Sequence, residues 1–240
     1  MFNGQWTTNH RPWFFPSSIV HCLWSIVTLR IIIFANGNLP NLEKARQLIR
    51  PDDFILCADG GTRHALALGL TPNAVIGDLD SVTEEERKKM KELDVEIIQH
   101  PTDKNETDLE LAIDYALTLN PNQILILAAL GGRMDQTLAN IALMSNSSLV
   151  THNLRITDGV EEIFFCRDHA QVVGRSGDIV SLIPWQGEVT GVFTENLRWH
   201  LHHETLYPDK TRGISNEMTA DVATVSLTSG LLLITHITGN

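Results

Sequence analysis

Cysteine is scarce in this sequence and is not arranged in pairs. The three cysteines, Cys22, Cys57 and Cys166, lie far apart and form no Cys-x-x-Cys motif. An odd, scattered set argues against a disulfide framework and against a structural zinc site built from paired cysteines. The sequence therefore predicts a protein of a reducing compartment, the cytoplasm.

Positive charge is also scarce. The chain has 18 Lys and Arg residues against 29 Asp and Glu residues, which gives a formal net charge of -11. Binding to nucleic acid or to anionic membranes regardless of sequence needs clustered Lys and Arg, so neither partner is predicted. A long apolar run is lacking as well. Residues 19–29 are apolar but contain His21, and a membrane span needs about 20 apolar residues.

Residues 1–29 show no clear period, with Trp6, Trp13 and Trp24 beside polar residues. We expect an N-terminal extension that is disordered or adventitious, and a docking arm or a targeting signal are the alternatives. Deleting residues 1–28 is expected to leave activity unchanged.

From residue 31 onwards, short apolar runs alternate with stretches of helical period. This alternation is typical of an α/β domain, in which helices connect parallel strands. The predicted strands are residues 31–35, 54–58, 74–77, 95–99 and 124–130, and the predicted helices are residues 41–49, 61–68, 83–93, 107–119 and 132–144.

After about residue 150 the pattern changes to β-branched or alternating runs separated by Gly, Asp and Asn. Strands are predicted at residues 162–166, 171–173, 179–183 and 222–228. The fold class is therefore an α/β parallel-sheet catalytic domain at residues 30–150, followed by a smaller antiparallel β-sandwich domain at residues 151–240. The change of pattern places the boundary within residues 146–155.

Acidic residues follow several of the predicted strands. Asp59 follows the second strand, Asp78 and Asp80 follow the third, and Asp108 begins a helix. Parallel strands end at one edge of a sheet, so these carboxylates should meet there. On an extended backbone, Asp78 and Asp80 would point to the same side. Carboxylate oxygens suit Mg2+, which would support phosphate transfer. A polar turn with a helix cap at Asp80 or Ser81 is the structural alternative.

Glycine-rich segments accompany two of these strand ends. Gly60 and Gly61 open a helix whose free amide groups could face phosphate, although glycines after a strand are commonly turn residues. Gly131 and Gly132 precede Arg133, which we expect to contact a nucleotide. A salt bridge from Arg133 to Asp135 is the simpler alternative.

In this order, the four segments Ala58-Asp59-Gly60-Gly61, Gly77-Asp78-Leu79-Asp80-Ser81, residues 103–108 and residues 131–135 resemble the thiamine pyrophosphokinase family. Residues 213–217, Gly-Ile-Ser-Asn-Glu, add a further match. The resemblance covers about residue 31 to the C-terminus. It implies a homodimer that transfers the diphosphoryl group of ATP to the hydroxyl of thiamine, giving thiamine diphosphate and AMP.

The resemblance also implies roles for single residues. Asp59, Asp78, Asp80 and Asp108 would be the catalytic carboxylates, with Asp78, Asp80 and Asp108 as Mg2+ ligands. The implied ATP contacts are Asn36, Gly60, Gly61, Lys104, Arg133 and Asp135. The implied thiamine contacts are Asp135, Ser215, Asn216 and Met218. Asp108 or Asp135 is the candidate acceptor for the thiamine hydroxyl proton.

Some positions depart from the family pattern. Met218 stands where an aromatic residue is usual, and Asn105 replaces a common acidic residue. In the further motif Asn196-Leu197-Arg198-Trp199, Asn196 stands where glycine is usual. Two alternative functions stay open: another Mg2+-dependent nucleotide transferase that uses Asp78 and Asp80, and a noncatalytic protein that binds thiamine or a nucleotide, which only Asn105 and Met218 support. His200, His202 and His203 invite a metal-site interpretation, but surface histidines are commoner.

Overall fold

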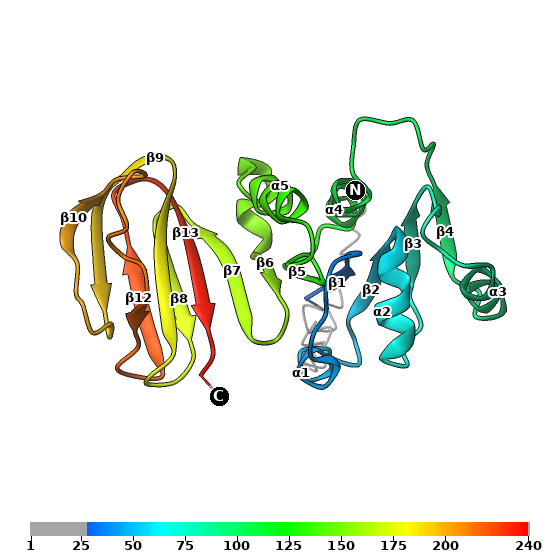
Figure 1. Cartoon of the computed structure of the whole chain (residues 1–240), viewed down its shortest axis with the longest axis horizontal. Helices are drawn as coiled ribbons and strands as arrows, with labels where there is room; N and C mark the ends of the chain where they lie inside the picture. The colour runs from blue at the N-terminus through cyan, green and yellow to red at the C-terminus, as the bar shows by residue number, and fades with distance from the viewer. Residues whose placement is uncertain (1–27, 240) are drawn as a thin grey trace, which may run out of the picture.

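The computed structural model of the chain describes residues 28–239. The predicted extension at residues 1–29 lies almost wholly outside this range, so its alternatives stay untested. The molecule is elongated, with α3 at one end and β10 at the other (Figure 1). The strands of the two halves join into one continuous 13-stranded sheet.

The first half of the sheet is parallel. Its strands are β1 (Arg30–Phe34), β2 (Phe54–Ala58), β3 (Ala74–Gly77), β4 (Glu96–Gln99), β5 (Gln123–Leu127) and β6 (Leu154–Thr157). They lie in the order β4-β3-β2-β1-β5-β6, and every neighbouring pair is parallel. The central strands β1, β2, β3 and β5 are almost wholly buried and mostly apolar, as the Ile31, Ile32 and Ile33 run illustrates, because both of their faces are covered.

Helices cover both faces of the parallel strands. They are α1 (Leu42–Gln47), α2 (Thr62–Ala67), α3 (Glu84–Glu92), α4 (Asp108–Thr118) and α5 (Met134–Met144), with short 3-10 turns at Asp59–Gly61 and Ser147–His152. Residues of α4 and α5 pack in one core layer, whereas Ala65 of α2 and Met90 of α3 pack in the other. The predicted threonine cap of the fourth helix is confirmed, because Thr107 accepts the Glu110 amide hydrogen bond.

The second half of the chain is an antiparallel sandwich. Its strands are β7 (Glu161–Cys166), β8 (His169–Val173), β9 (Ile179–Glu195), β10 (His202–Leu206), β11 (Asn216–Glu217), β12 (Val222–Ser226) and β13 (Ser229–Ile237). Strand β9 belongs to both layers. Its first part pairs with β13 and β11, and its second part pairs with β10 and β12. It changes layer around Gln186 and Gly187, which both have positive φ.

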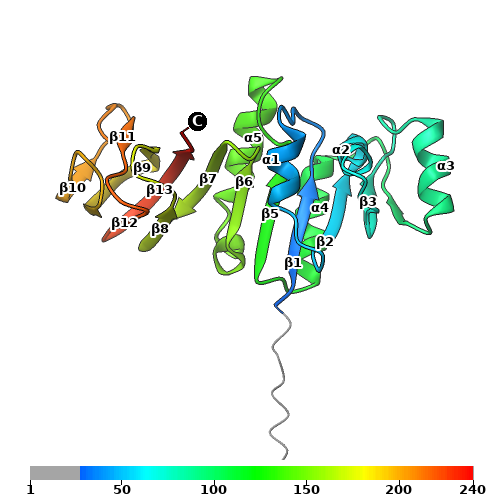
Figure 2. The same cartoon turned by 90° about the horizontal axis from the view of Figure 1, so that it is seen from below.

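Strands β7 and β13 lie between the helix-covered strands and the rest of the sandwich in both views (Figure 2). Ile163 of β7 and Leu233 of β13 belong to the same core layer as α4 and α5. The two halves therefore share apolar packing in addition to the continuous sheet. None of the helices in residues 28–239 combines the length and the apolarity that crossing a membrane requires.

The predicted fold class is confirmed, with differences at the ends of elements. The fifth strand stops at Leu127 rather than at residue 130, because Ala128 has a φ of 57° and turns the chain away. Strand β6 was not predicted and extends the parallel sheet to Thr157. The domain limits at residues 150 and 151 stay a prediction.

Candidate active site

A cleft of about 490 Å3 lies where the parallel strands end. Its walls come from the segments that follow β1, β2, β3, β4 and β5, so the carboxyl edge of the sheet forms its floor. The lining residues that carry the argument below are Asn36, Asp59, Asp78, Asp80, Lys104, Asp108 and Arg133.

Asp59 is the most buried carboxylate of the cleft, with 3 % of its surface exposed. It follows β2 in a tight turn and has a φ of 45°, which is uncommon for a residue with a side chain. Its Oδ1 atom is buried and has no hydrogen-bond partner among the described residues. Burial raises the pKa of Asp59, and the charges of Asp108 and Asp80 raise it further. A buried carboxylate oxygen of this kind could serve as a ligand to a cation.

Asp78 and Asp80 lie on a turn, not on the extended backbone that the sequence predicted. Leu79 between them has a φ of 64° and buries its side chain, so the chain bends at this point. The Asp80 amide donates to Asp78 Oδ1 at 3.1 Å. This hydrogen bond, with help from Lys104, lowers the pKa of Asp78. The two side chains still converge, but they do so because Leu79 between them has a left-handed backbone conformation.

The oxygens of Asp59, Asp78 and Asp80 form a group that could hold a metal ion. One carboxylate oxygen from each residue lies within 4.8 Å of the other two. Three convergent carboxylates and an unpartnered buried oxygen fit a hard divalent cation such as Mg2+, which prefers oxygen ligands. The helix-cap alternative for Asp80 and Ser81 does not hold, since Thr83 caps α3 with a complete capping box.

Asp108 lies beside this group and is bound by Lys104. The Lys104 ammonium is 3.0 Å from Asp108 Oδ1 and 3.6 Å from Asp78 Oδ2. Gly77 makes room for the arrangement, because a Cβ there would come within 2.9 Å of Asp59 Cβ and 3.0 Å of Asp108 Oδ1. The structure thus gathers all four predicted carboxylates, with Asp59 rather than Asp108 in the group of three.

Gly60 and Gly61 do not line the cleft. A Cβ on Gly60 would lie 2.6 Å from Asn36 Oδ1, and one on Gly61 would lie 2.0 Å from the Phe34 carbonyl oxygen. These glycines permit close packing of the turn against β1. Asn36, predicted with them as an ATP contact, does line the cleft.

Arg133 lies at the start of α5 and lines the cleft, with 71 % of its side chain exposed. Its Nε atom donates to Asp135 Oδ1 at 3.1 Å, so the predicted salt bridge to Asp135 is present. This hydrogen bond lowers the pKa of Asp135 and raises the pKa of Arg133. Asp135 itself is exposed and is not among the residues that line the cleft.

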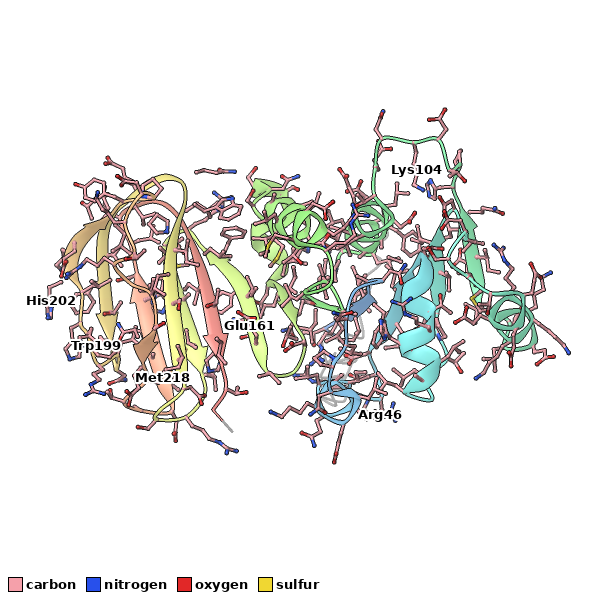
Figure 3. All side chains as sticks on the ribbon, in the orientation of Figure 1. Arg46, Lys104, Glu161, Trp199, His202 and Met218 are labelled. Atoms are coloured by element: carbon pink, nitrogen blue, oxygen red, sulfur yellow. The ribbon has the colours of Figure 1, made fainter. Side chains whose placement is uncertain are left out.

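Three of the four residues predicted to bind thiamine, Ser215, Asn216 and Met218, lie in the sandwich, whereas Asp135 lies on α5. Ser215 is exposed and has a φ of 56°. Asn216 is buried and hydrogen-bonded to the backbone of Trp199. Met218 is fully buried in the sandwich core, which does not favour a direct contact with a ligand. Trp199 is 56 % exposed, with the Arg198 guanidinium 5.0 Å from its ring. Figure 3 shows Trp199 and Lys104 in opposite halves of the molecule.

Several cleft residues were not predicted, among them Asn38, Ser81, Gln136 and Asn140. Gln136 and Asn140 are one helical turn apart on α5 and share a face of it, so this spacing was the available signal. The histidine cluster at residues 200–203 is not part of any metal-capable group among the described residues.

Comparison with known proteins gives the same family for both halves. Residues 45–157 match the family model "Thiamin pyrophosphokinase, catalytic domain". Residues 167–232 match "Thiamin pyrophosphokinase, vitamin B1 binding domain". Together the two models cover most of the chain.

Individual relatives agree with the family models. A thiamine pyrophosphokinase of Bacillus subtilis (strain 168) is 29% identical over 182 residues, which is 75% of this chain and 85% of the relative. Thiamine pyrophosphokinase 1 of Oryza sativa subsp. japonica is 25% identical over 206 residues, 74% of this chain and 76% of the relative. The crystal structure of the Bacillus subtilis protein superposes with a TM-score of 0.80 and 26% identity, covering 88% of this chain and 100% of that one.

Proposed function

The chain belongs to the thiamine pyrophosphokinase family, and we propose that it transfers the diphosphoryl group of ATP to the hydroxyl of thiamine. The products are thiamine diphosphate and AMP. The observation that carries the proposal is the cleft at the carboxyl edge of the sheet, where Asp59, Asp78 and Asp80 converge beside Lys104.

In the proposed reaction the thiamine hydroxyl oxygen attacks the β-phosphorus of ATP. A bond forms between that oxygen and the β-phosphorus, the bond from the β-phosphorus to the α,β-bridging oxygen breaks, and AMP leaves with that oxygen. Such a transfer needs positioning and charge neutralisation more than a covalent nucleophile. The cleft supplies carboxylates for a cation and two cationic side chains, Lys104 and Arg133, for phosphate oxygens.

We propose Mg2+ as the cofactor, held by Asp59, Asp78 and Asp80. When bound, Mg2+ neutralises negative charge on the phosphate oxygens of the transferred group. Because Asp59 is deeply buried, its carboxylate has little freedom to move and can offer the ion an oxygen at a fixed position. The turn through Leu79 orients the carboxylates of Asp78 and Asp80 toward that oxygen. Asp108 was predicted as a ligand too, and its ion pair with Lys104 gives it a position next to this group.

ATP is proposed to lie along the β1 and β5 ends of the cleft. Asn36 and Asn38 line this part of the cleft together with the segment from Gly131 to Arg133, and Gly131 lies directly beside Asn38. Arg133 is the N-cap of α5 and makes no side-chain capping hydrogen bond, so amide groups of the first turn are available to phosphate. Gly60 and Gly61 contribute indirectly, because without side chains they let the turn that carries Asp59 pack closely against the end of β1.

The hydroxyl proton needs an acceptor. Of the two predicted candidates, Asp108 lines the cleft, whereas Asp135 is held by Arg133 outside its lining. We therefore favour Asp108. For Asp135, we propose that it positions the Arg133 guanidinium.

We propose a homodimer in which the sandwich of one copy completes the site of the other. The carboxylate cleft and the Trp199 surface lie far apart within one chain (Figure 3). Ser215 and Asn216 would then approach thiamine from the second copy, with Trp199 as an exposed apolar wall. Met218 would support this surface from the core. A cytoplasmic location is part of the proposal, and the buried free thiols of Cys57 and Cys166 are compatible with it.

Asn105 and Met218, which differ from the residues usual in the family, give no support to a noncatalytic role. Asn105 is exposed and is not part of the cleft lining, and Met218 is fully buried. Neither substitution reaches the three carboxylates.

The proposal is tested by incubating the protein with ATP and Mg2+, with and without thiamine. AMP and thiamine diphosphate are both measured, the latter by mass. Matching amounts that depend on thiamine are expected. AMP formation that is the same without thiamine, or a folded protein that forms no AMP, would overturn the proposal.

A second experiment tests the shared site. Asp80→Asn is expected to inactivate the enzyme through its cleft, and Trp199→Ala is expected to leave little activity at a low thiamine concentration because thiamine binding is weakened. Mixing and refolding the two variants together should restore about a quarter of normal activity, because half of the dimers then combine one intact cleft with one intact sandwich surface. A mixture that stays inactive would contradict the shared site, provided that mixed wild-type chains refold to full activity.

A further inference from the structure

Lys104 occupies an unusual place among the carboxylates of the cleft. It lies in the segment between β4 and α4 (Figure 3). Its ammonium contacts Asp108 Oδ1 at 3.0 Å and Asp78 Oδ2 at 3.6 Å, and 12 % of its side chain is exposed. A lysine held this closely by two carboxylates is more than a solvated surface charge.

Asp78 belongs to two groups at once. It is one of the three carboxylates that could hold a metal ion, and it is also a partner of Lys104. Two of the four carboxylates of the cleft, those of Asp78 and Asp108, therefore contact a single ammonium group, and Asp78 connects it to the group of three. In the arrangement described, Lys104 is the positive charge that offsets part of their mutual repulsion.

A divalent cation and the Lys104 ammonium would compete for Asp78. Both carry positive charge, so sharing one carboxylate at close range makes them repel each other. The lysine side chain has a flexible four-carbon stem and can move its charge by rotation about single bonds. Asp108, which is not one of the group of three, offers it a second partner, and the cleft beside it is where the phosphates of ATP are proposed to lie.

We propose that Lys104 is an exchangeable counter-cation for the metal site. Before metal binds, it neutralises Asp78 and Asp108 and keeps the carboxylates together. When a divalent cation binds, the ammonium leaves Asp78 and becomes available to phosphate oxygens. Metal binding without nucleotide is then weak, and metal and nucleotide strengthen each other's binding. This inference rests on the metal site of the proposed function.

The test uses Mn2+ as the probe and measures its free and bound forms by electron paramagnetic resonance. Titrations are made without nucleotide and with α,β-methylene-ATP, whose α,β bridge cannot be cleaved. Lys104→Met is compared with wild-type protein and with Lys91→Met, an exposed position on α3 that changes the net charge by the same amount. Lys104→Gln, which keeps polar contacts without the charge, serves if Lys104→Met does not fold.

Without nucleotide, Lys104→Met is expected to bind Mn2+ about tenfold tighter than wild type, since a competing cation is gone. The factor by which the nucleotide analogue tightens Mn2+ binding should fall toward one. Lys91→Met should match wild type in both titrations. A simple phosphate-binding role for Lys104 would leave the nucleotide-free affinity for Mn2+ unchanged.

Equal or weaker Mn2+ binding by Lys104→Met overturns the exchange and leaves the proposed function intact. If wild-type protein binds no Mn2+ with or without the analogue, the proposed metal site fails and the exchange fails with it. If the variant binds Mn2+ tighter but wild-type protein forms no thiamine diphosphate, the exchange stands and the diphosphoryl transfer does not.

Discussion

Asn216 holds the backbone of Trp199 from beneath with two side-chain hydrogen bonds. The Trp199 amide donates to Asn216 Oδ1 at 3.0 Å, and Asn216 Nδ2 donates to the Trp199 carbonyl oxygen at 2.7 Å. Asn216 is buried while the Trp199 ring is largely exposed. The position of this aromatic surface therefore depends on one amide that supplies both a donor and an acceptor.

Replacing Asn216 with Asp is expected to displace Trp199 and weaken thiamine binding. The aspartate lacks the Nδ2 donor and places a carboxylate oxygen against the Trp199 carbonyl oxygen, which leaves buried acceptors without donors. We expect the KM for thiamine to rise about tenfold, with a smaller change in kcat. Steady-state kinetics with saturating ATP measures both constants.

The Trp199→Ala variant and the Asn216→Asp, Trp199→Ala double variant provide the control. If Asn216 acts through Trp199, the double variant should bind thiamine no more weakly than Trp199→Ala alone. Additive losses would instead show that Asn216 contacts the substrate itself or has a separate structural effect.

The parallel half of the sheet could be predicted because a strand that is buried on both faces is a short, nearly uninterrupted run of apolar residues. The strands at residues 54–58 and 74–77 were predicted with the same limits that the structure shows. The sandwich was harder. Strand β13 was missed because Leu227 and Thr228, which separate it from β12, continue the apolar and β-branched character of both strands.

The carboxylates of the site could be predicted as a set, but their geometry could not. Asp59, Leu79 and Ala128 have positive φ although none is glycine, so residue type gave no sign of the turns that shape the cleft. Met218 lies in a short segment of β-structure, where too few residues alternate to show which side chain faces the core. Its full burial became clear only from the packing of the sandwich.

Gly77→Ala tests the close packing around Asp59. Gly77 has a φ of 148°, and an added Cβ would lie 2.9 Å from Asp59 Cβ. We expect a loss of about 1 to 3 kcal/mol in the free energy of unfolding and a large loss of activity, because the carboxylates must move apart. Urea unfolding and the AMP assay measure the two effects.

Gly69→Ala is the matched control for that variant. Gly69 also has a positive φ, 69°, but a Cβ there would meet nothing within 4 Å. It should cost about 1 kcal/mol in stability and leave activity unchanged. If both variants kept normal activity, Gly77 would not be needed for the geometry of the site.

Asp80→Asn tests the carboxylate group directly. Asp80 is exposed and hydrogen-bonded to the Ser81 hydroxyl, so the substitution should leave the fold intact. Loss of a charged ligand is expected to lower kcat about a thousandfold or more. Asp114→Asn, an exposed change on α4, should keep normal kcat. Near-normal turnover of Asp80→Asn would remove Asp80 from the site.

Asp178 supports the sandwich through a buried set of contacts, and its variant should show a defined pH dependence. Its carboxylate accepts hydrogen bonds from His236 Nε2 at 3.0 Å, from the Arg175 amide at 2.9 Å and from the Gly239 amide at 2.8 Å. Burial by itself would raise the pKa of Asp178, but these hydrogen bonds outweigh burial and lower it. Asp178→Asn is expected to lose about 2 kcal/mol in the free energy of unfolding at pH 7.

The pH dependence of that loss follows from the lowered pKa. A carboxyl whose pKa is lower in the folded protein stabilises the fold fully above its unfolded value, about 3.9, and loses this contribution as the pH falls through the folded value. The stability gap between wild type and Asp178→Asn should therefore shrink as the pH falls below about 4. Urea unfolding between pH 7 and pH 3 measures the gap, with Asp209→Asn as an exposed control. A gap of the same size at pH 3 and pH 7 would mean that the charge of Asp178 contributes nothing, and that shape and neutral hydrogen bonding alone hold these strands.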